Sequence, residues 1–447
     1  MTLELADTTD PHALALRAFV WGYPLVRAAQ LRINLTRPDD PCAARPPTVA
    51  GAPINTMGHA RALATPQTRV GVAPNNDTLY SIAWLDLDAG PFVLESPDFG
   101  NRYYTFQMGQ ADSSTDRSIG QRTHGGRLPP ILIVGPGHPG DVPPGMERVR
   151  SHHRYLMVAG RILVNGPADL PAVHALQDQI RLRSWSAWQA GIAGLTVVSA
   201  QRPLTDSTRP VNDGLGFLEQ LGGVLPDLTL SPQEKGIVES LRCIGLVPGS
   251  GFHMESLTAE ACAAVAAGLR DGEALVRSKT LDLGRKVNGW SINDRGSRFG
   301  EDYLLRAAVA MDQIYIVEPE EALYPSARID ASGQALDGRH RYRLRFPPGT
   351  LPPVRAFWSI TIYYAKGFMV PNPINRWAIG DRTPGLVLAP DGTLDILLQH
   401  APPAGAMAAN WLPTPTEAFM LLMRLYHPQA QALNGQWVPP AIERIES

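Results

Sequence analysis

The stretch PNNDTLYS, residues Pro74 to Ser81, is the part of the sequence from which the N-terminal fold can be read. Its Asn-Asn-Asp triplet favours a turn, because short polar side chains hydrogen-bond nearby backbone groups and tolerate left-handed conformations. The residues that follow are typical of a strand, whose alternate side chains point to opposite faces. We therefore expect Leu79 to face a core and Tyr80 to project from the other face, beside Asp77. Asp77 also fits a simpler role as a cap for local backbone amides.

Short β-prone runs separated by Gly, Pro, Asn and Asp continue from this stretch to about residue 162. Several strands at such short spacing predict an antiparallel sandwich. Similar runs return from Tyr342 onward, where the apolar run Ala356–Tyr364 predicts a central sheet strand.

Helical patterns occupy the remaining parts of the chain. Apolar residues recur at steps of three and four over Ala13–Arg32, which predicts a helix. Residues 171–311 are also helical in texture, and Ser231–Glu234 has the form of a capping box. The expected fold class is mainly β with a substantial helical section, in which an N-terminal β-sandwich, a helical middle and a second sandwich follow one another.

Charge and cysteine content restrict the classes of function. The net charge of −2 gives no basic surplus for nucleic acid or for an anionic membrane, and no apolar run is long enough to span a bilayer. Cys42, Cys243 and Cys262 are far apart and form no CxxC, so we expect neither a disulfide framework nor a cysteine-rich zinc site. The first twenty residues lack a basic segment before an apolar one, which argues against a secretory signal. We expect a cytoplasmic protein.

Two patterns that often mark cofactor or metal sites lack the local structure that such sites require. Gly135–Gly140 matches GxGxxG, but the two prolines at 143 and 144 prevent the helix that a dinucleotide site requires, so a turn is expected. His152 and His153 are adjacent and would point to opposite faces of a strand, which makes them poor joint metal ligands. We predict no cofactor. A divalent metal bound by residues from distant loops has no motif to support it and stays an open alternative.

Further clusters combine polar and aromatic side chains. Strand alternation over Arg102–Gln107 puts Tyr104 and Gln107 on opposite faces, and the segment leads to Arg122, whose planar guanidinium suits a carboxylate or phosphate. An ion pair with an acidic loop explains Arg122 equally well. In the C-terminal part, tryptophans near asparagine amides suit a small polar or ring-bearing ligand, although the same residues fit a core whose polar groups are satisfied.

The candidate catalytic residues are His59, Asp77 and Tyr80. The unperturbed pKa of histidine lies near neutrality, so His59 would be the general base or acid, with Asp77 orienting it and Tyr80 or Tyr104 donating a proton. His59 also fits a structural role. The candidate substrate-binding residues are Asn55, Asn75, Tyr104, Gln107, Arg122, Trp358, Tyr363, Asn372, Arg376, Asn410 and Trp411.

In these motifs the sequence resembles the bacterial proteins that pair domain-of-unknown-function family 1254 with domain-of-unknown-function family 1214. The first resemblance runs from Trp21–Pro24 through Pro74–Ser81 to Gly160-Arg161, and the second from Phe299–Tyr303 through Asn410–Pro413 to Pro439-Pro440. The chain departs from the family pattern at His124, where a second threonine is expected.

The resemblance implies an N-terminal sandwich, a helical section and a jelly-roll-like C-terminal sandwich. We expect the N-terminal helix and the first sandwich over residues 1–170, the helical section over 171–313 and the second sandwich over 314–447. The resemblance implies no particular reaction. We expect Pro74–Ser81 and Asn410–Pro413 to face one cleft between the two sandwiches, and the side chains of His59, Asp77, Tyr80 and Arg122 to converge there.

Three functions compete. The first is an enzyme that acts on a small polar or anionic metabolite by acid–base chemistry in this cleft, as a hydrolase or as a lyase or isomerase. The second is a non-catalytic protein that binds a small molecule or a carbohydrate. The third is a scaffold whose sandwiches mainly assemble into oligomers, which predicts no concave pocket between them. The expected partners are a small-molecule ligand and, as a homo-oligomer, further copies of the chain.

Overall fold

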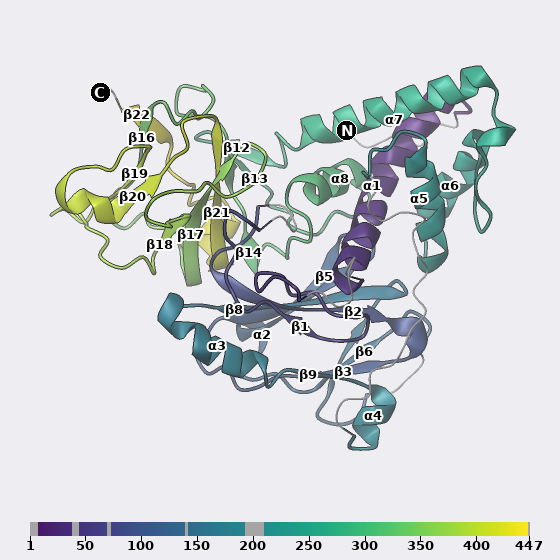
Figure 1. The fold of residues 1–447 in the computed structure, drawn as a ribbon, viewed down its shortest axis with the longest axis horizontal. Helices are drawn as coiled ribbons and strands as arrows, with labels where there is room; N and C mark the ends of the chain where they lie inside the picture. Colours follow the sequence, from purple (N-terminus) through teal and green to yellow (C-terminus); the bar gives the residue numbers. More distant parts are fainter. Residues whose placement is uncertain (1–7, 38–43, 69–72, 139–141, 193–209, 446–447) are drawn as a thin grey trace.

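The structure is a computed structural model that describes residues 8–37, 44–68, 73–138, 142–192 and 210–445. Three parts are visible in Figure 1: a sandwich built from the N-terminal third, a group of helices, and a second sandwich near the C-terminus. The N-terminal sandwich lies below the other two parts in that view. The predicted class, mainly β with a substantial helical section, is confirmed.

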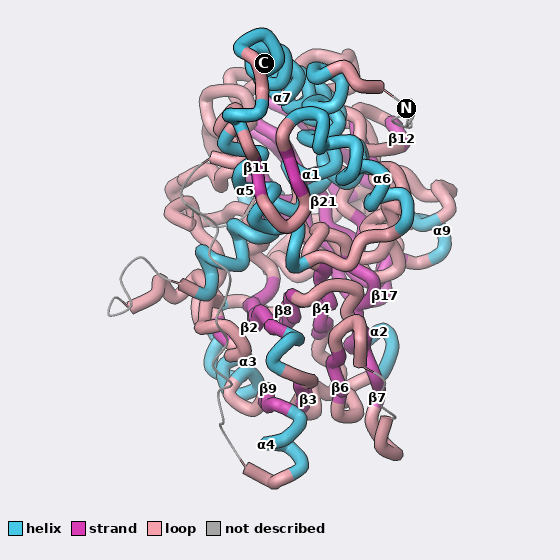
Figure 2. The backbone as a smooth tube through the Cα atoms, turned by 90° about the vertical axis from the view of Figure 1, so that its right-hand side faces the viewer, coloured by secondary structure: helices cyan, strands magenta, loops and turns pink. Residues whose placement is uncertain are grey.

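Two antiparallel-rich sheets form the N-terminal sandwich, one above the other in the lower half of Figures 1 and 2. The first sheet contains, in order, β1 (Gly58–His59), β2 (Thr78–Asp86), β8 (Tyr155–Leu163), β4 (Tyr104–Gln110) and β5 (Thr115–Gly120). The second contains β7 (Glu147–Arg150), β6 (Ile131–Val134), β3 (Phe92–Glu95) and β9 (Arg181–Ser184). Leu79 is buried in the core between them, as its place in the alternation predicts.

The helices pack around α1 (Pro11–Thr36), which begins after Asp10, whose carboxylate accepts a hydrogen bond from the Ala13 N–H at 3.1 Å. Helices α5 (Gly216–Val224), α7 (Ala259–Lys279) and α8 (Tyr303–Asp312) contact α1 and share one apolar core with it. Helix α6 (Pro232–Ser240) begins with the predicted capping box, in which Ser231 and Glu234 exchange hydrogen bonds of 3.0 and 3.2 Å. Within the described ranges, none of the helices is both long and apolar enough to cross a bilayer.

The C-terminal sandwich has two sheets with a core of large apolar side chains between them. The larger sheet contains β12 (Arg285–Val287), β13 (Trp290–Ile292), β15 (Ser326–Ala327), β21 (Phe419–Pro428), β17 (Val354–Tyr364) and β18 (Ala378–Gly380), with β14 (Ala322–Leu323) also on β21. The smaller contains β20 (Trp411–Pro413), β19 (Leu394–Gln399), β16 (Arg341–Phe346) and β22 (Ile442–Ile445). The predicted central strand is confirmed, because β17 lies between β21 and β18. Strands β12 and β13 come from a segment expected to be helical.

The outer faces of the two large sheets meet. Tyr103, beside β4, packs edge-on against Phe357 of β17 and Tyr426 of β21, with ring centroids 5.4 and 5.2 Å apart. The same Tyr103 donates a hydrogen bond of 2.6 Å to Glu321, which precedes β14. A cavity lies beside this contact between the sandwiches.

Candidate functional site

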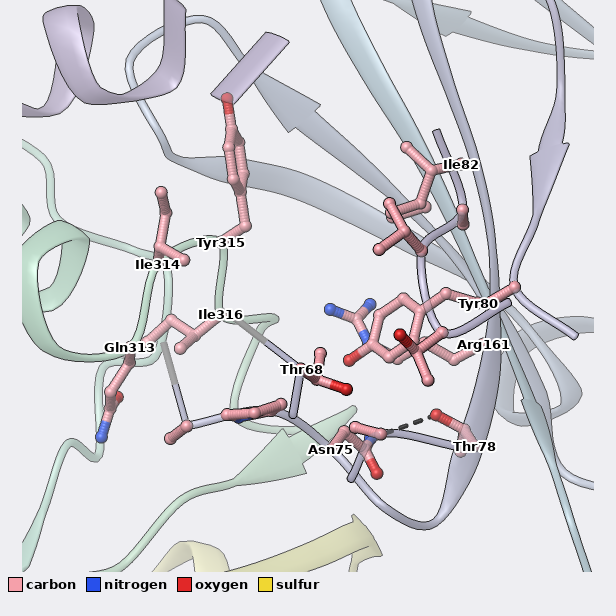
Figure 3. A pocket seen from close by; sticks show the side chains of 18 of the residues that line it. Thr68, Asn75, Thr78, Tyr80, Ile82, Arg161, Gln313, Ile314, Tyr315 and Ile316 are labelled. Carbon is pink, nitrogen blue, oxygen red and sulfur yellow. Dashed lines mark hydrogen bonds between the residues drawn. The ribbon is translucent and has the colours of Figure 1, made fainter. Parts of the chain in front are cut away.

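A cavity of about 190 Å³ lies where the outer face of β2 and β8 approaches β21. Its remaining walls come from the end of α1, the loop segments 48–75 that the structure describes, and the segment Gln313–Ile316 after α8. Figure 3 shows Tyr80 and Arg161 on one side of this space and Gln313–Ile316 on the opposite side. A concave pocket therefore exists between the sandwiches, contrary to what the scaffold hypothesis predicts.

Strand alternation places Tyr80 and Arg161 side by side. Tyr80 on β2 and Arg161 on β8 are direct partners across the antiparallel ladder, so both side chains leave the same face of the sheet. The Arg161 Nε–H donates to the Tyr80 hydroxyl at 3.3 Å, and the guanidinium carbon lies 5.1 Å from the centre of the Tyr80 ring. The arginine therefore holds the phenol oxygen in the cavity wall.

Two buried guanidinium groups line the cavity without a carboxylate partner. Arg161 is 7% exposed and Arg424, on β21, is 3% exposed. Arg424 donates to the Ala73 carbonyl at 2.8 Å and to the Tyr363 hydroxyl at 2.9 Å. Neither arginine forms an ion pair in the described part of the chain, and Arg161 Nη1 is buried there without any hydrogen-bond partner. A buried charge is normally paired, so this arrangement favours an anionic ligand.

Tyr80 differs from the other tyrosines of the cavity in its acidity. Burial raises the pKa of Tyr80, but the charge and hydrogen bond of Arg161 and the charge of Arg424 outweigh burial, so the net pKa lies below the usual value. Burial raises the pKa of Tyr324 to about 12 and holds those of Tyr315 and Tyr426 well above the usual range. Tyr80 is therefore the cavity tyrosine that gives up a proton more readily than Tyr324, Tyr315 or Tyr426.

Backbone strain is concentrated in the cavity wall. Ala73, Ile314 and Tyr315 all line the cavity and have φ angles of 45°, 29° and 51°. Residues with side chains rarely adopt this region, least of all β-branched ones, and each instance costs on the order of 1–3 kcal/mol. Gln107 Nε2 holds the strained segment in place by donating to the carbonyls of Tyr315 and Ile316 at 2.8 and 3.1 Å. Strain that the surroundings enforce is typical of functional sites.

The rest of the wall is mostly apolar, with side chains such as Leu35, Ile82, Met157, Ile314 and Leu422. No histidine, aspartate, glutamate, lysine or cysteine occurs among its described lining residues. An apolar space with a few convergent polar groups is typical of small-molecule sites. The chemistry of the wall therefore suits an organic anion with an apolar body.

The four residues expected to converge do not all reach this cavity; of them, only Tyr80 lines it. His59 pairs with Ser81 in the β1–β2 ladder and therefore leaves the opposite face of the sheet from Tyr80. Its Nδ1 lies 2.9 Å from the Ser81 hydroxyl, and burial together with the charge of Arg61 lowers the pKa of His59 to about 4. His59 is thus mostly neutral at pH 7 and separated from the cavity by the sheet.

Asp77 and Arg122 take part in contacts between the two sandwiches. The Asp77 carboxylate accepts a hydrogen bond of 2.6 Å from the Ser359 hydroxyl and forms an ion pair with Arg382. Arg122 Nε donates to Glu321 at 2.7 Å, which matches the alternative of an ion pair with an acidic loop. Both side chains have protein partners for their charges and lie outside the cavity lining.

The other N-terminal candidates separate into one cavity residue and three supporting ones. Asn75 lines the cavity and donates to the Tyr426 hydroxyl at 2.7 Å. Asn55 accepts a hydrogen bond of 2.8 Å from the Asp86 N–H. Tyr104 is in the sandwich core and donates to the Gly125 carbonyl at 3.0 Å. Gln107 acts on the cavity indirectly, through the strained segment described above.

The C-terminal candidates do not line the cavity. Trp358 is in the C-terminal core, and Tyr363 donates to the Pro74 carbonyl at 2.7 Å, behind Arg424. Asn372 donates to the Arg376 carbonyl at 2.9 Å and so closes its own loop. Arg376 in turn donates to the carbonyls of residues 408, 409 and 411.

The segment Asn410–Pro413 is satisfied within its own sandwich. Asn410 is fully buried and exchanges hydrogen bonds of 2.8 and 2.7 Å with the Val387 backbone, and the Trp411 indole N–H donates to the Gln399 carbonyl at 2.8 Å. Of the two motifs expected to share one cleft, Pro74–Ser81 therefore lines the cavity and Asn410–Pro413 does not.

Among the cavity residues that sequence reasoning did not select as site candidates are Arg161, Tyr324, Arg424 and Tyr426. Nothing in their local sequence identified them as site residues. The informative signal is the register between β2 and β8, which sets Arg161 opposite Tyr80, and a single sequence does not reveal that register.

Within the described ranges, no observation indicates a metal site or a dinucleotide site. These residues contain no group of three or more His, Cys, Asp or Glu side chains placed to hold a metal ion. The expected turn at Gly135–Gly140 is partly visible, because the His138 N–H donates to the Gly135 carbonyl at 3.3 Å, while residues 139–141 lie outside the described residues.

Comparison with known proteins assigns the two sandwiches to families. Residues 54–184 match the family described as protein of unknown function DUF1254, and residues 321–430 match the family described as protein of unknown function DUF1214. A comparison with curated proteins gave no match.

Solved structures were compared as well. The crystal structure of the VPA0106 protein from Vibrio parahaemolyticus is similar in fold, with a TM-score of 0.70 and 24% identity over 98% of this chain and 100% of that one. A crystal structure of an uncharacterized protein from Burkholderia cenocepacia gives a TM-score of 0.45 and 11% identity over 96% of this chain and 88% of that one. The family matches, in the predicted order, identify this chain as one that pairs a DUF1254 region with a DUF1214 region.

Proposed function

We propose that the protein is an enzyme that binds a small organic anion with an apolar body in the cavity between its sandwiches and transfers a proton through Tyr80. The observation that carries the proposal is the pair of buried guanidinium groups, Arg161 and Arg424, that line an apolar cavity without a carboxylate partner in the described residues. Together they also lower the pKa of Tyr80, although burial alone would raise it.

The proposed chemistry follows from the contacts. The Arg161 guanidinium, which lines the cavity, donates to the anionic group of the ligand in a charge-assisted hydrogen bond. The ligand is then fixed beside the Tyr80 oxygen, which takes or returns a proton as general base or acid. A single base beside a bound carboxylate fits elimination or isomerisation better than hydrolysis, since none of the described lining residues supplies a second, histidine or carboxylate, group.

A second candidate is a protein that binds the same anion without converting it. The same absence of a second catalytic group from the described lining favours it. The two candidates share Arg161 as the binding residue and differ in the role of Tyr80, so they can be separated experimentally.

Binding is tested by isothermal titration calorimetry with octanoate as the probe. We expect the wild type to bind octanoate and Arg161→Met to bind it about 10- to 100-fold more weakly, the usual loss for a hydrogen bond to a charged group. Arg345→Met is the matched control, because Arg345 is a half-exposed arginine that pairs with Asp395 in the smaller sheet of the C-terminal sandwich, outside the cavity lining. Equal affinities for wild type and Arg161→Met would contradict the proposal.

Catalysis is tested by incubating the protein in D₂O with octanoate, 2-octenoate, 3-hydroxyoctanoate and 3-oxooctanoate, and following carbon-bound protons by NMR. The enzyme hypothesis predicts that the wild type exchanges or converts at least one compound. It also predicts that Tyr80→Phe still binds this compound but no longer exchanges its protons or converts it. Tight binding of a compound that always emerges unchanged would instead support the binding protein.

A further inference from the structure

We infer that Tyr324 is a second catalytic residue of this cavity and that the substrate is an oxo acid, an organic anion with a ketone on its apolar body. Tyr324 donates a hydrogen bond to the ketone oxygen while Tyr80 takes a proton from the carbon beside it. The inference rests on the proposed function, which supplies the anion site and the role of Tyr80. It adds the group that faces the substrate oxygen and the chemical class of the substrate.

Each of the two large sheets contributes one tyrosine and one arginine to the cavity. Tyr80 and Arg161 are opposite each other in the ladder between β2 and β8. Strands β14 and β15 pair with β21 in one register, which sets Tyr324, the residue after β14, opposite Arg424. Residues directly opposite in a ladder share a face of the sheet, and both of these line the cavity. The cavity therefore has a tyrosine and an arginine on either side of the contact between the sandwiches.

The hydroxyl of Tyr324 is available to a ligand. Two other tyrosines of the cavity use their hydroxyls within the protein, since Tyr315 donates to the Gln110 carbonyl at 2.9 Å and Tyr426 accepts from Asn75 at 2.7 Å. The Tyr324 hydroxyl makes no hydrogen bond among the described residues, and it is not sealed in the wall, because the side chain is partly exposed and lines the cavity. A ligand oxygen can therefore accept a hydrogen bond from it.

The groups around the Tyr324 hydroxyl are those of the proposed anion site. Apart from burial, the groups that act most strongly on the pKa of Tyr324 are Arg161, Tyr80 and Arg424. Electrostatic interactions weaken with distance, so the Tyr324 hydroxyl lies near the groups that hold the anion and move the proton. A ligand fixed by Arg161 therefore lies within reach of both phenols.

The two phenols are suited to opposite roles. Arg161 donates to the Tyr80 hydroxyl at 3.3 Å, which favours the deprotonated form and contributes to the lowered pKa of Tyr80. Arg424 instead donates to the Thr361 hydroxyl at 2.8 Å, so Tyr324 receives no such hydrogen bond and burial raises the pKa of Tyr324 to about 12. Environments that separate the pKa values of two groups are typical of acid–base catalysis. Tyr80 is thus suited to take a proton, and Tyr324 to stay protonated and donate.

The proposed step is enolisation of the ketone. Deprotonated Tyr80 takes a proton from the carbon beside the carbonyl, the C–H electron pair forms a C=C bond, and the carbonyl π pair moves to the oxygen. Tyr324 donates a hydrogen bond to this oxygen as its negative charge develops. Return of a proton from Tyr80 to the same carbon restores the ketone, and in D₂O it leaves deuterium there. A weak acid suffices for this task, whereas release of hydroxide from a hydroxy acid requires complete proton transfer.

The test follows carbon-bound protons by NMR in D₂O with 3-, 4- and 5-oxooctanoate, which differ in the spacing between carboxylate and ketone. We expect the wild type to exchange protons of at least one of them faster than buffer alone. Tyr324→Phe should slow this exchange about 100-fold, the usual loss when one donor to a developing oxyanion is removed. Its affinity for octanoate, which has no ketone, should stay within about twofold of wild type by calorimetry, because Arg161 is intact.

Tyr364→Phe is the matched control, because Tyr364 is a partly exposed tyrosine of β17 outside the cavity lining. It should exchange the oxo acid at the wild-type rate. Tyr324→Met is a second variant without the hydroxyl, and thermal unfolding checks that each variant is folded. Loss of exchange with octanoate affinity preserved distinguishes a catalytic role from a structural one.

The outcomes separate this inference from the proposed function. Exchange at the wild-type rate in either folded Tyr324 variant would overturn the role of Tyr324 and leave the proposed function standing. An equal loss of octanoate affinity in these variants would overturn it too. A wild type that binds octanoate and converts 2-octenoate or 3-hydroxyoctanoate through Tyr80, but exchanges none of the three oxo acids, would overturn only the inference. No binding of octanoate or of any oxo acid would contradict both.

Discussion

Two arginines lie along the contact between the sandwiches, the partly buried Arg382 and the buried Arg161, and their partners differ. Arg382 forms an ion pair with Asp77 and donates to the Val164 carbonyl at 2.9 Å. Arg161, which lies on the cavity side, has a tyrosine hydroxyl for one N–H group and, among the described residues, no partner for Nη1. The first arrangement joins the sandwiches, whereas the second leaves binding capacity unused. Both arise around one turn, since Asp77 and Tyr80 are three residues apart.

This difference teaches how one motif can serve two purposes. Asp77 points toward Ser359 and Arg382 and stabilises the contact on which the cavity depends. Tyr80 lines the cavity and accepts a hydrogen bond from Arg161, which has no carboxylate partner among the described residues. We therefore expect loss of the Asp77–Arg382 ion pair to destabilise the fold, and loss of Arg161 to affect ligand binding with little effect on stability.

The largest effect is expected from Asp77→Ala. Removing the carboxylate leaves Arg382 partly buried and without its charge partner, so the free energy of unfolding should fall by about 3–5 kcal/mol. Urea unfolding measures this loss. Arg345→Ala breaks a half-exposed pair and should cost less than about 1 kcal/mol. Similar losses for the two variants would mean that the Asp77 pair is not special.

A somewhat smaller effect is expected from Asn410→Ala, which leaves the backbone groups of Val387 and Asp395 without their hydrogen bonds to the Asn410 side chain. The free energy of unfolding should fall by about 2–3 kcal/mol, while affinity for octanoate stays unchanged at temperatures where the variant is folded. A specific loss of affinity in the folded variant would show that the 410–413 segment belongs to the binding site after all.

His59 should make stability depend on pH. Because its pKa in the folded protein is lowered to about 4, the unfolded chain binds a proton at higher pH than the folded one. The contribution of His59 to the free energy of unfolding is therefore fully present above about pH 6.5 and is lost as the pH falls toward 4. Between these limits the wild type should lose about 1–3 kcal/mol more stability than His59→Gln in urea unfolding. Parallel pH profiles for the two proteins would refute this role.

The smallest change in stability is expected from Arg161→Met. The variant removes a buried charge that has no carboxylate partner, so the free energy of unfolding should stay within about 1 kcal/mol of wild type or rise. Differential scanning calorimetry measures it alongside Asp77→Ala. A loss as large as that of Asp77→Ala would mean that Arg161 serves the fold instead of a ligand.

Local patterns allowed much of the fold to be predicted. The alternation in β2 correctly separated Leu79 from Tyr80, the capping box at Ser231 formed, and the run Ala356–Tyr364 became a central strand. Each depends on residues within a few positions of one another. The strands at 285–292 were missed because short strands that complete a distant sheet have little periodicity of their own.

The site was harder to predict, because its members meet only through tertiary structure. Tyr80 and Asn75 were selected and do line the cavity, but Arg161 becomes their neighbour through a pairing over 81 positions. The left-handed backbone conformation of Ile314 could not be predicted, because isoleucine rarely adopts it. His59 and Tyr80 were expected together, yet the ladder between β1 and β2 sends them to opposite faces.

The most direct test of the central claim, that Arg161 in this cavity binds an organic anion, is a crystal structure with 8-bromooctanoate and data collected at the bromine absorption edge. The account predicts a carboxylate oxygen within about 3 Å of a guanidinium nitrogen of Arg161 and a bromine signal inside the same cavity. A bromine signal found only elsewhere, or a carboxylate turned away from Arg161, would contradict it.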